Sequence, residues 1–337
     1  STGLPYASTS RGVDPDGIVV AFMHACGHDM HVTCLMGAAA TLAEDAHWTG
    51  TLVALFQPAE EVARGASAMI ADALYDRVPR PDVVLGQHVA PIPAGALGLR
   101  SGPAFAATDS LRVTLIGSGG HGSRPEATVD PVVMAASTVM RLQTIVSREV
   151  AGTDTAVLTV GASRAGTKAN IIPEQAELLL NVRTYDPHVR DTVLAAVTRI
   201  VEAEADAAGA SSKPIIESIE SAPAVVNEVD AVERTRAPLE SVVGAGRVID
   251  PGPVTGSEDV GLLASAAEAP CVFWLLGGAD PSAFAGAADA DARTRVMASL
   301  PSNHPPAYAP VIQPPLTVGS DSLTAAALAW LGPASND

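Results

Sequence analysis

The sequence contains little cysteine, little positive charge and no long apolar run, and each shortage limits what the chain can be. Three cysteines in 337 residues cannot form a disulfide framework, so we expect a reducing, cytoplasmic compartment. Lysine and arginine number 20 against 37 aspartates and glutamates, a net charge of −17. Nucleic acids and anionic membranes require clustered basic surface, so the charge argues against either as a partner.

No apolar stretch reaches the roughly 18 residues of a membrane-spanning helix, and the first residues lack the pattern of a signal peptide. Hydrophobic residues nevertheless make up 47% of the chain, which is ample for real cores. At roughly 150 residues per domain, the length favours two domains. We therefore expect a soluble intracellular chain with two cores.

The densest polar stretch, His24 to His31, holds three histidines, a thiol and a carboxylate in eight positions. It follows an apolar run over 17–22 that is typical of a buried strand, and it precedes a predicted helix over 32–44. Ligands collect at the carboxyl ends of strands in open α/β sheets, and thiolate and imidazole suit zinc. The stretch is therefore as consistent with a metal site at Cys26 and His28 as with a simpler alternative. That alternative is a core cysteine with capping histidines and the aspartate as a helix N-cap.

Two further strands are predicted over 51–56 and 83–88, with a helix between them. The first is followed by Glu60 and Glu61, and the second ends in His88. Alone, a glutamate pair is most often solvated surface and a lone histidine is usually structural. Three strand ends that each carry a metal-competent group at one sheet edge are instead typical of metal-assisted hydrolysis, in which cations polarise a carbonyl and a carboxylate takes the proton.

The middle of the chain has a different pattern, a β-α-β-β-α-β order that indicates an α+β unit on an antiparallel sheet. Its helices are predicted to open at Asp130 and Asp186, each an N-cap followed by proline. Its strands are predicted over 111–116, 156–161, 176–183 and 214–219.

The α/β alternation then resumes with a buried strand over 272–276 and a terminal helix over 323–331. The long, weakly periodic segment 277–318 contains His304 and is typical of a functional loop or of a disordered segment. The predicted fold class is α/β, a mainly parallel sheet flanked by helices with an inserted α+β domain. The predicted boundaries are 1–108 and 221–337 for the two parts of the first domain and 109–220 for the insertion.

Four motifs taken together resemble the M20 metallopeptidase family, within its subgroup of N-acyl-amino-acid amidohydrolases (hippurate hydrolases, aminoacylase-like enzymes and plant indole-acetyl-amino-acid hydrolases). The motifs are His24-Ala25-Cys26-Gly27-His28-Asp29, Gln57-Pro58-Ala59-Glu60-Glu61, Gly86-Gln87-His88 and Asn303-His304-Pro305. The resemblance covers nearly the whole chain. It implies a two-metal centre in which Cys26 bridges, with Glu60 as general base. The five ligands that it implies are Cys26, His28, Glu61, His88 and His304.

Two divalent metal ions per subunit are thereby implied. Thiolate, imidazole and carboxylate together suit Zn or Mn, and also Co or Ni, and the affinity order alone does not choose among them.

The resemblance also implies that the inserted unit is a lid and dimerisation domain, so we expect a homodimer. In the family's pattern His121 stabilises the oxyanion, often in a partner subunit's site, and Asn170 and Arg183 contact the substrate's amide and carboxylate. Gly256 and Ser257 belong to a further signature, Gly256-Ser257-Glu258-Asp259, expected to contribute backbone amides. From the residues alone, the glycine loop around His121 is as consistent with a hinge, although the planar fork of Arg183 suits a carboxylate.

The implied reaction is hydrolysis of an N-acyl amino acid to a carboxylate and a free amino acid. A dipeptidase or an N-acetyl-amino-acid deacetylase of the same family is the alternative within the enzyme class. A catalytically silent metal-binding dimer is the alternative outside it. The family carries a further N-terminal segment upstream of the stretch that begins here at Thr2, so we expect the first domain to be N-terminally incomplete.

Overall fold

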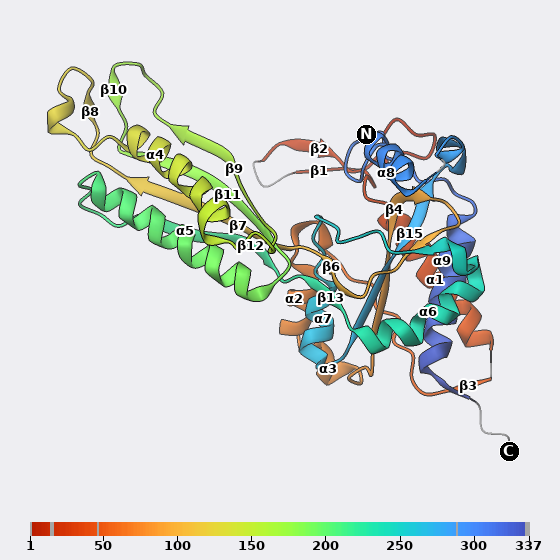
Figure 1. Cartoon of the computed structure of the whole chain (residues 1–337). Helices are drawn as coiled ribbons and strands as arrows, with labels where there is room; N and C mark the ends of the chain where they lie inside the picture. The colour runs from red at the N-terminus through yellow and green to blue at the C-terminus, as the bar shows by residue number, and fades with distance from the viewer. Residues whose placement is uncertain (1, 14–16, 46, 288, 334–337) are drawn as a thin grey trace.

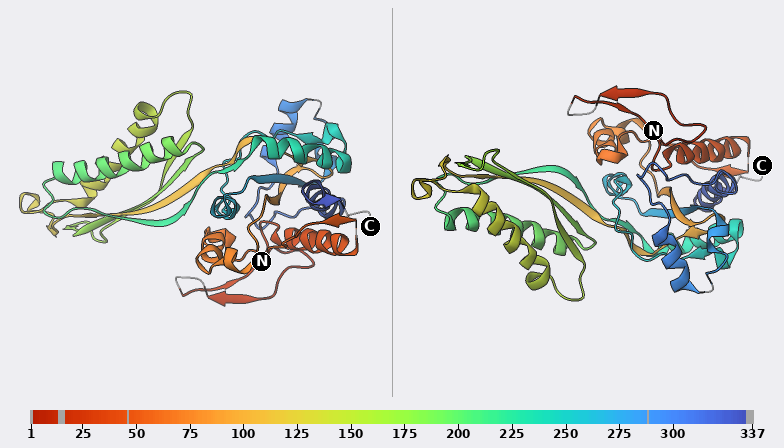
Figure 2. Two further views of the ribbon diagram at one scale, coloured as in Figure 1. Left: turned by 90° about the horizontal axis from the view of Figure 1, so that it is seen from below. Right: turned by 90° about the horizontal axis from the view of Figure 1, so that it is seen from above.

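The computed structural model describes residues 2–13, 17–45, 47–287 and 289–333 and has two lobes (Figures 1 and 2). One lobe, here called the body, holds both ends of the chain and consists of the described residues before 107 and after 222. The other lobe, here called the inserted unit, is built from residues 107–222 and extends away from the body. The predicted α/β class is confirmed, whereas the exact domain boundaries stay a prediction.

A four-stranded mixed sheet with the order β14-β5-β15-β4 forms the centre of the body. The pairs β15–β4 and β14–β5 are parallel and β15–β5 is antiparallel. The strands are β4 (Val84–Pro93), β5 (Leu97–Gly98), β14 (Val248–Ile249) and β15 (Cys271–Ala279). The strand predicted over 272–276 is confirmed as β15, buried on both faces as expected for the middle of an α/β sheet.

Helices cover both faces of this sheet. Alternate residues of β15 such as Trp274 pack against α1, α6 and α9, and those between them, such as Phe273, pack toward α7. The helices of the body are α1 (His28–Glu44), α2 (Gly65–Ala71), α3 (Leu74–Arg77), α6 (Val229–Val243), α7 (Val260–Ala267), α8 (Ala290–Ser299) and α9 (Pro315–Trp330). Among the described residues, no helix is both long and apolar enough to cross a membrane.

Short strand pairs complete the body. They are β1 (Arg11–Val13) with β2 (Val19–Ala21), β3 (Trp48–Thr49) with β16 (Gly332–Pro333), and β6 (Gly102–Phe105) with β13 (Val225–Asn227).

Two predicted strands are wrong. The apolar run over 17–22 contains only the three-residue β2, which pairs with β1 outside the central sheet and leaves Val19 61% exposed. Residues 51–56 form no strand, and three of them, Val53, Leu55 and Phe56, line a cavity of about 320 Å³ together with residues of β4. An apolar run becomes a sheet strand only where another strand can satisfy its backbone groups. Of the three predicted strand ends, only that of β4 belongs to the central sheet.

The long segment 277–318 is also more ordered than predicted. It contains the helix α8 and a short 3-10 turn, Pro281–Phe284, and the terminal helix α9 begins at Pro315 rather than at 323. His304 lies in the irregular stretch between α8 and α9.

The inserted unit is an antiparallel sheet with the order β12-β7-β11-β9, packed against α4 and α5. Its elements are β7 (Ala107–Ile116), β9 (Ala156–Ala165), β11 (Gln175–Thr184), β12 (Ile215–Ala222), α4 (Pro131–Thr144) and α5 (Pro187–Ala207). The predicted N-caps are confirmed, since Asp130 accepts from the Val132 amide at 2.8 Å and Asp186 from the His188 amide at 2.7 Å. The short pair β8 (Gly120–His121) and β10 (Ile171–Ile172) lies at the end far from the body (Figure 1).

Candidate metal centre

Four segments of the body bring six metal-competent side chains together. The segments are the turn before α1, the 3-10 turn Glu60–Val62, the strand β4 and the stretch after α8. The side chains are Cys26, His28, Glu60, Glu61, His88 and His304. They are the five predicted ligands and the predicted general base. Long stretches of chain separate the four segments that carry them.

The closest contacts among these side chains each join a histidine nitrogen to a cysteine sulfur or a glutamate oxygen. Cys26 Sγ lies 3.4 Å from His88 Nε2, and His304 Nε2 lies 3.2 Å from Glu61 Oε2. His28 Nε2 lies 3.4 Å from Glu60 Oε2 and 3.8 Å from Glu61 Oε1.

These atoms form three overlapping groups of potential ligands, with the ligand atoms of each group within 4.8 Å of one another. The groups are Cys26, His28 and His88; Cys26, Glu61 and His304; and His28, Glu60 and Glu61. Sulfur, imidazole and carboxylate are the donors that zinc and related divalent ions take. Because Cys26 belongs to the first two groups, the donor set fits two ions that share one thiolate ligand.

The backbone around Cys26 explains why this turn contains glycine. Helix α1 begins at His28, with Gly27 at the N-cap in the left-handed region at φ 81°. A Cβ on Gly27 would lie 2.3 Å from a methyl carbon of Val89, so only glycine permits this approach of α1 to β4. The alternative that makes Asp29 the N-cap is wrong, because Asp29 lies inside the first turn of the helix.

Two residues that were not predicted as ligands hold the centre together. Asn303 donates through Nδ2 to the carbonyl oxygen of Cys26 at 3.2 Å, to its Sγ at 3.4 Å, and to the carbonyl of Val89 at 3.2 Å. The Val89 amide donates to Nε2 of the half-buried His31 at 2.9 Å. Asn303 belongs to the Asn303-His304-Pro305 motif, but no pattern in the neighbouring sequence predicts these hydrogen bonds.

The protonation states suit metal binding. Burial lowers the pKa of His88 to about 4, so its ring is neutral. His88 Nδ1 lies 2.8 Å from the Val89 carbonyl oxygen, which can only accept, so Nδ1 carries the proton and Nε2 presents its lone pair toward Cys26. Burial, together with Glu61, Glu60 and Glu258, raises the pKa of Cys26 to about 12, although the hydrogen bond from Asn303 lowers it. A thiolate here therefore requires added positive charge, which cations would supply.

Two carboxyls lie beside the ligands, Glu60 half-buried and Glu258 buried. Burial, together with the nearby carboxylates of Glu61, Asp259 and Glu220, raises the pKa of Glu60 to about 7. Glu258 is 8% exposed, and burial together with Glu60 and Asp259 raises its pKa to about 8. A carboxyl whose pKa lies near neutrality is suited to accept and return a proton. The motif that contains Glu258 was expected to contribute backbone amides, and the burial of the Glu258 side chain was not predicted.

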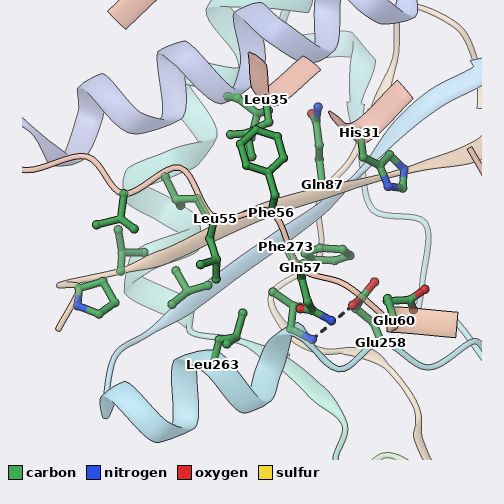
Figure 3. A pocket seen from close by; sticks show the side chains of 18 of the residues that line it. His31, Leu35, Leu55, Phe56, Gln57, Glu60, Gln87, Glu258, Leu263 and Phe273 are labelled. Atoms are coloured by element: carbon green, nitrogen blue, oxygen red, sulfur yellow. Dashed lines mark hydrogen bonds between the residues drawn. The ribbon is translucent and has the colours of Figure 1, made fainter. Parts of the chain in front are cut away.

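The cavity beside the ligands is mostly apolar (Figure 3). Leu35, Phe56 and Leu263 are among the side chains that line it, and Glu60 and Glu258 lie together at one end. The centre therefore borders both solvent and an apolar space of about 320 Å³.

The remaining predicted site residues lie elsewhere. His121 is on β8 and Asn170 directly precedes β10, so both are at the far end of the inserted unit, away from the ligands of their own chain (Figure 1). Arg183, at the end of β11 nearest the body, donates to the carbonyl of Thr255 at 2.8 Å and to Ser257 Oγ at 3.3 Å. The carbonyl of Gly256 accepts from the Ala106 amide at 3.0 Å. Their roles toward a substrate stay predictions.

Comparison with known proteins gives a consistent result. Residues 1–302 match the model of the family described as Peptidase family M20/M25/M40. N-acetyl-L-cysteine deacetylase of Bacillus subtilis (strain 168) is 38% identical over 267 residues, which cover 77% of this chain and 59% of that protein. Hippurate hydrolase of Campylobacter jejuni is 36% identical over 262 residues, covering 77% of this chain and 65% of that protein.

A solved structure agrees with these matches. The YXEP protein of Bacillus subtilis, described as a dinuclear metal-binding peptidase of the M20 family, has a TM-score of 0.71 and 26% identity. The match covers 98% of this chain and 77% of that one. By contrast, the chain spans about three fifths of the length of the curated relatives it matches.

Proposed function

Because the chain belongs to peptidase family M20/M25/M40, we propose that it is a metal-dependent amidohydrolase that cleaves N-acyl amino acids to a carboxylate and a free amino acid. One observation carries the proposal. Two groups of metal-ligand atoms share Cys26, and a half-buried carboxyl, Glu60, lies beside them with its pKa raised to about 7. Relatives that act on N-acetylcysteine and on hippurate support this substrate class.

In the proposed reaction, Glu60 transfers the proton and His28 is a metal ligand. Bound divalent ions would polarise the scissile carbonyl and acidify a water molecule. Glu60 accepts the proton from the attacking water and returns it to the leaving nitrogen, because its pKa favours both directions near neutral pH. His28, whose pKa is lowered by burial, stays neutral and keeps its nitrogen lone pair for a metal.

The inserted unit serves as lid and dimerisation domain in this proposal, in a cytoplasmic homodimer. His121 stabilises the oxyanion in the partner's site, an effect of about 3–4 kcal/mol for one donor. Asn170 contacts the substrate amide, and Arg183 with Gly256 and Ser257 forms the binding site for its carboxylate. The position of β8 far from the ligands of its own chain supports service to a second subunit (Figure 1). Free thiols at all three cysteines support a reducing compartment.

The test combines turnover with metal content on one sample. Hippurate, N-acetyl-methionine, an indole-acetyl amino acid and a free-amino dipeptide are offered to the protein before and after chelation. Hydrolysis of acyl amino acids that disappears with chelator and returns with Mn²⁺ or Zn²⁺ is expected. Faster cleavage of the dipeptide would indicate a dipeptidase, and two bound ions without turnover on any substrate would indicate a silent metal-binding protein.

A further inference from the structure

Glu60 and Glu61 lie on a loop, residues 57–66, whose backbone is not relaxed. Ala59 and Ala63 flank the two glutamates, and both adopt the left-handed region, with φ of 52° and 48°. That conformation costs an L-residue roughly 1–2 kcal/mol. Hydrogen bonds inside the loop, such as Ala63 amide to Glu60 carbonyl at 2.7 Å, do not tie it to the rest of the body. Other contacts must therefore hold the loop in this shape.

Asp259 supplies these contacts from another part of the chain. Its side chain is 1% exposed, and Oδ1 accepts a hydrogen bond from Gln57 Nε2 at one end of the loop. Oδ2 accepts from the Ala66 amide at 3.1 Å at the other end. One carboxylate thus ties both ends of the loop that carries the two glutamates.

Asp259 does not use its side chain in the ordinary way for its position. It is the N-cap residue of α7 but makes no capping hydrogen bond to that helix. The carboxylate of Glu258 accepts instead from the Asp259 amide at 3.0 Å and the Val260 amide at 3.3 Å. Asp259 is therefore free to cap α2, whose own N-cap residue, Arg64, offers no side-chain acceptor.

The segment that carries Asp259 is itself anchored. Arg183 donates to the carbonyl of Thr255 at 2.8 Å and to Ser257 Oγ at 3.3 Å, which fixes the stretch just before Asp259 against β11. The loop is also closely folded, because a Cβ on Gly65 would lie 1.7 Å from the carbonyl oxygen of Pro58. A small shift at either end would therefore move the glutamates.

We propose that Asp259 is a positioning residue that holds Glu60 and Glu61 in place for metal binding and proton transfer. The inference rests on the proposed two-metal amidohydrolase function, but it concerns only the loop that carries these glutamates. The ligand groups of Cys26, Glu61 and His304 and of His28, Glu60 and Glu61 depend on the loop, whereas the group of Cys26, His28 and His88 contains no residue of it. Loss of the Asp259 carboxylate should therefore weaken one ion and spare the other.

The experiment titrates Zn²⁺ alone into the metal-free protein and its variants. The unchanged protein is expected to bind two ions. Asp259→Ala should bind one with unchanged affinity and the second about 10- to 100-fold more weakly, in the range typical for loss of a residue that supports a metal ligand. Asp259→Asn should recover most of this loss, because its amide can accept from the Ala66 N–H and donate to Gln57 once that amide turns over.

Two further variants keep the result interpretable. Glu228→Ala removes a capping carboxylate of α6, which accepts from the Asp230 and Ala231 amides elsewhere in the body, and both ions should remain. Gln57→Leu removes only one of the two bonds to Asp259 and should weaken the second ion even if Asp259→Ala does not fold. Unchanged binding in Asp259→Ala, or equal weakening of both ions in step with the melting temperature, would overturn the proposal.

Hydrolysis of acyl amino acids provides a separate reading. In the Asp259→Ala protein loaded with excess Zn²⁺, kcat should fall with little change in KM, because the base rather than substrate binding is displaced. If no substrate is turned over by any variant, the proposed function fails while the zinc titration still decides the role of Asp259. If turnover is normal in Asp259→Ala and two ions bind as before, the positioning role fails and the function stands.

Discussion

The buried carboxyl of Glu258 should make the metal-free protein less stable as the pH rises. Its pKa is raised from 4.5 to about 8 by burial, by Glu60 and by Asp259. Below the unfolded pKa the group is neutral in both states and has no effect. Between the two pKa values the folded state keeps a proton that the unfolded state has lost, so stability falls with rising pH until the loss is complete above about 8.

Glu258→Gln should remove this pH dependence. The amide oxygen can still accept from the Asp259 and Val260 amides, and no charge is buried. The interval from about pH 5.5 to the folded pKa is about 2.5 pH units, and each unit changes the free energy of unfolding by about 1.4 kcal/mol. The free energy of unfolding of the variant, relative to the unchanged protein, should therefore grow by about 3 kcal/mol between pH 5.5 and 9. Relaxation around the ionised group makes this an upper value. This pH range lies above the pI of about 4.7. A protein tends to precipitate at its pI, because its net charge is then zero.

Urea unfolding of chelator-treated protein, followed by tryptophan fluorescence, measures this difference. The three tryptophans, Trp48, Trp274 and Trp330, all lie in the body, so the signal reports the lobe that contains Glu258. Glu233→Gln, which removes an exposed charge on α6, is the matched control and should show no such growth. An advantage of Glu258→Gln that is the same at both pH values would refute the reasoning.

Three other expectations concern the centre directly. Glu60→Gln should retain both ions while turnover falls about 10²- to 10⁴-fold, the usual contribution of a general base; near-normal rates would exclude Glu60 from that role. Cys26→Ala should lose metal because two of the three ligand groups contain its sulfur, and elemental analysis showing unchanged metal content would contradict the bridging assignment. If His121 serves the partner's site, mixed dimers of Glu60→Gln and His121→Ala chains should regain turnover that neither variant has alone; no recovery in a verified mixed dimer would argue against it.

The family and the fold class were predictable from the sequence because their signals are local. Cys26 and His28 are two residues apart and Glu60 and Glu61 are adjacent, so short sequence motifs are enough to predict their roles. The family match over residues 1–302 confirms the resemblance that these motifs carry. The caps Asp130 and Asp186 were equally legible, since an N-cap acts within three residues of itself.

Sheet membership was not predictable in the same way. The apolar runs over 17–22 and 51–56 have the composition of buried strands, yet neither joins the central sheet. Whether such a run pairs depends on a neighbouring strand, and among the described residues β2 pairs only with the short β1.

The sequence by itself determined which residue types are available for metal chemistry and that a helix, α1, follows the turn at Cys26. The tertiary structure alone decided that Asn303 and His304 meet the turn at Cys26, that His121 lies far from the ligands of its own chain, and that Asp259 ties the loop of Glu60. Capping and periodicity are set by neighbours along the chain. Contacts between residues some two hundred or more positions apart, such as these ties to Cys26 and to the Glu60 loop, arise only once both lie on the packed body.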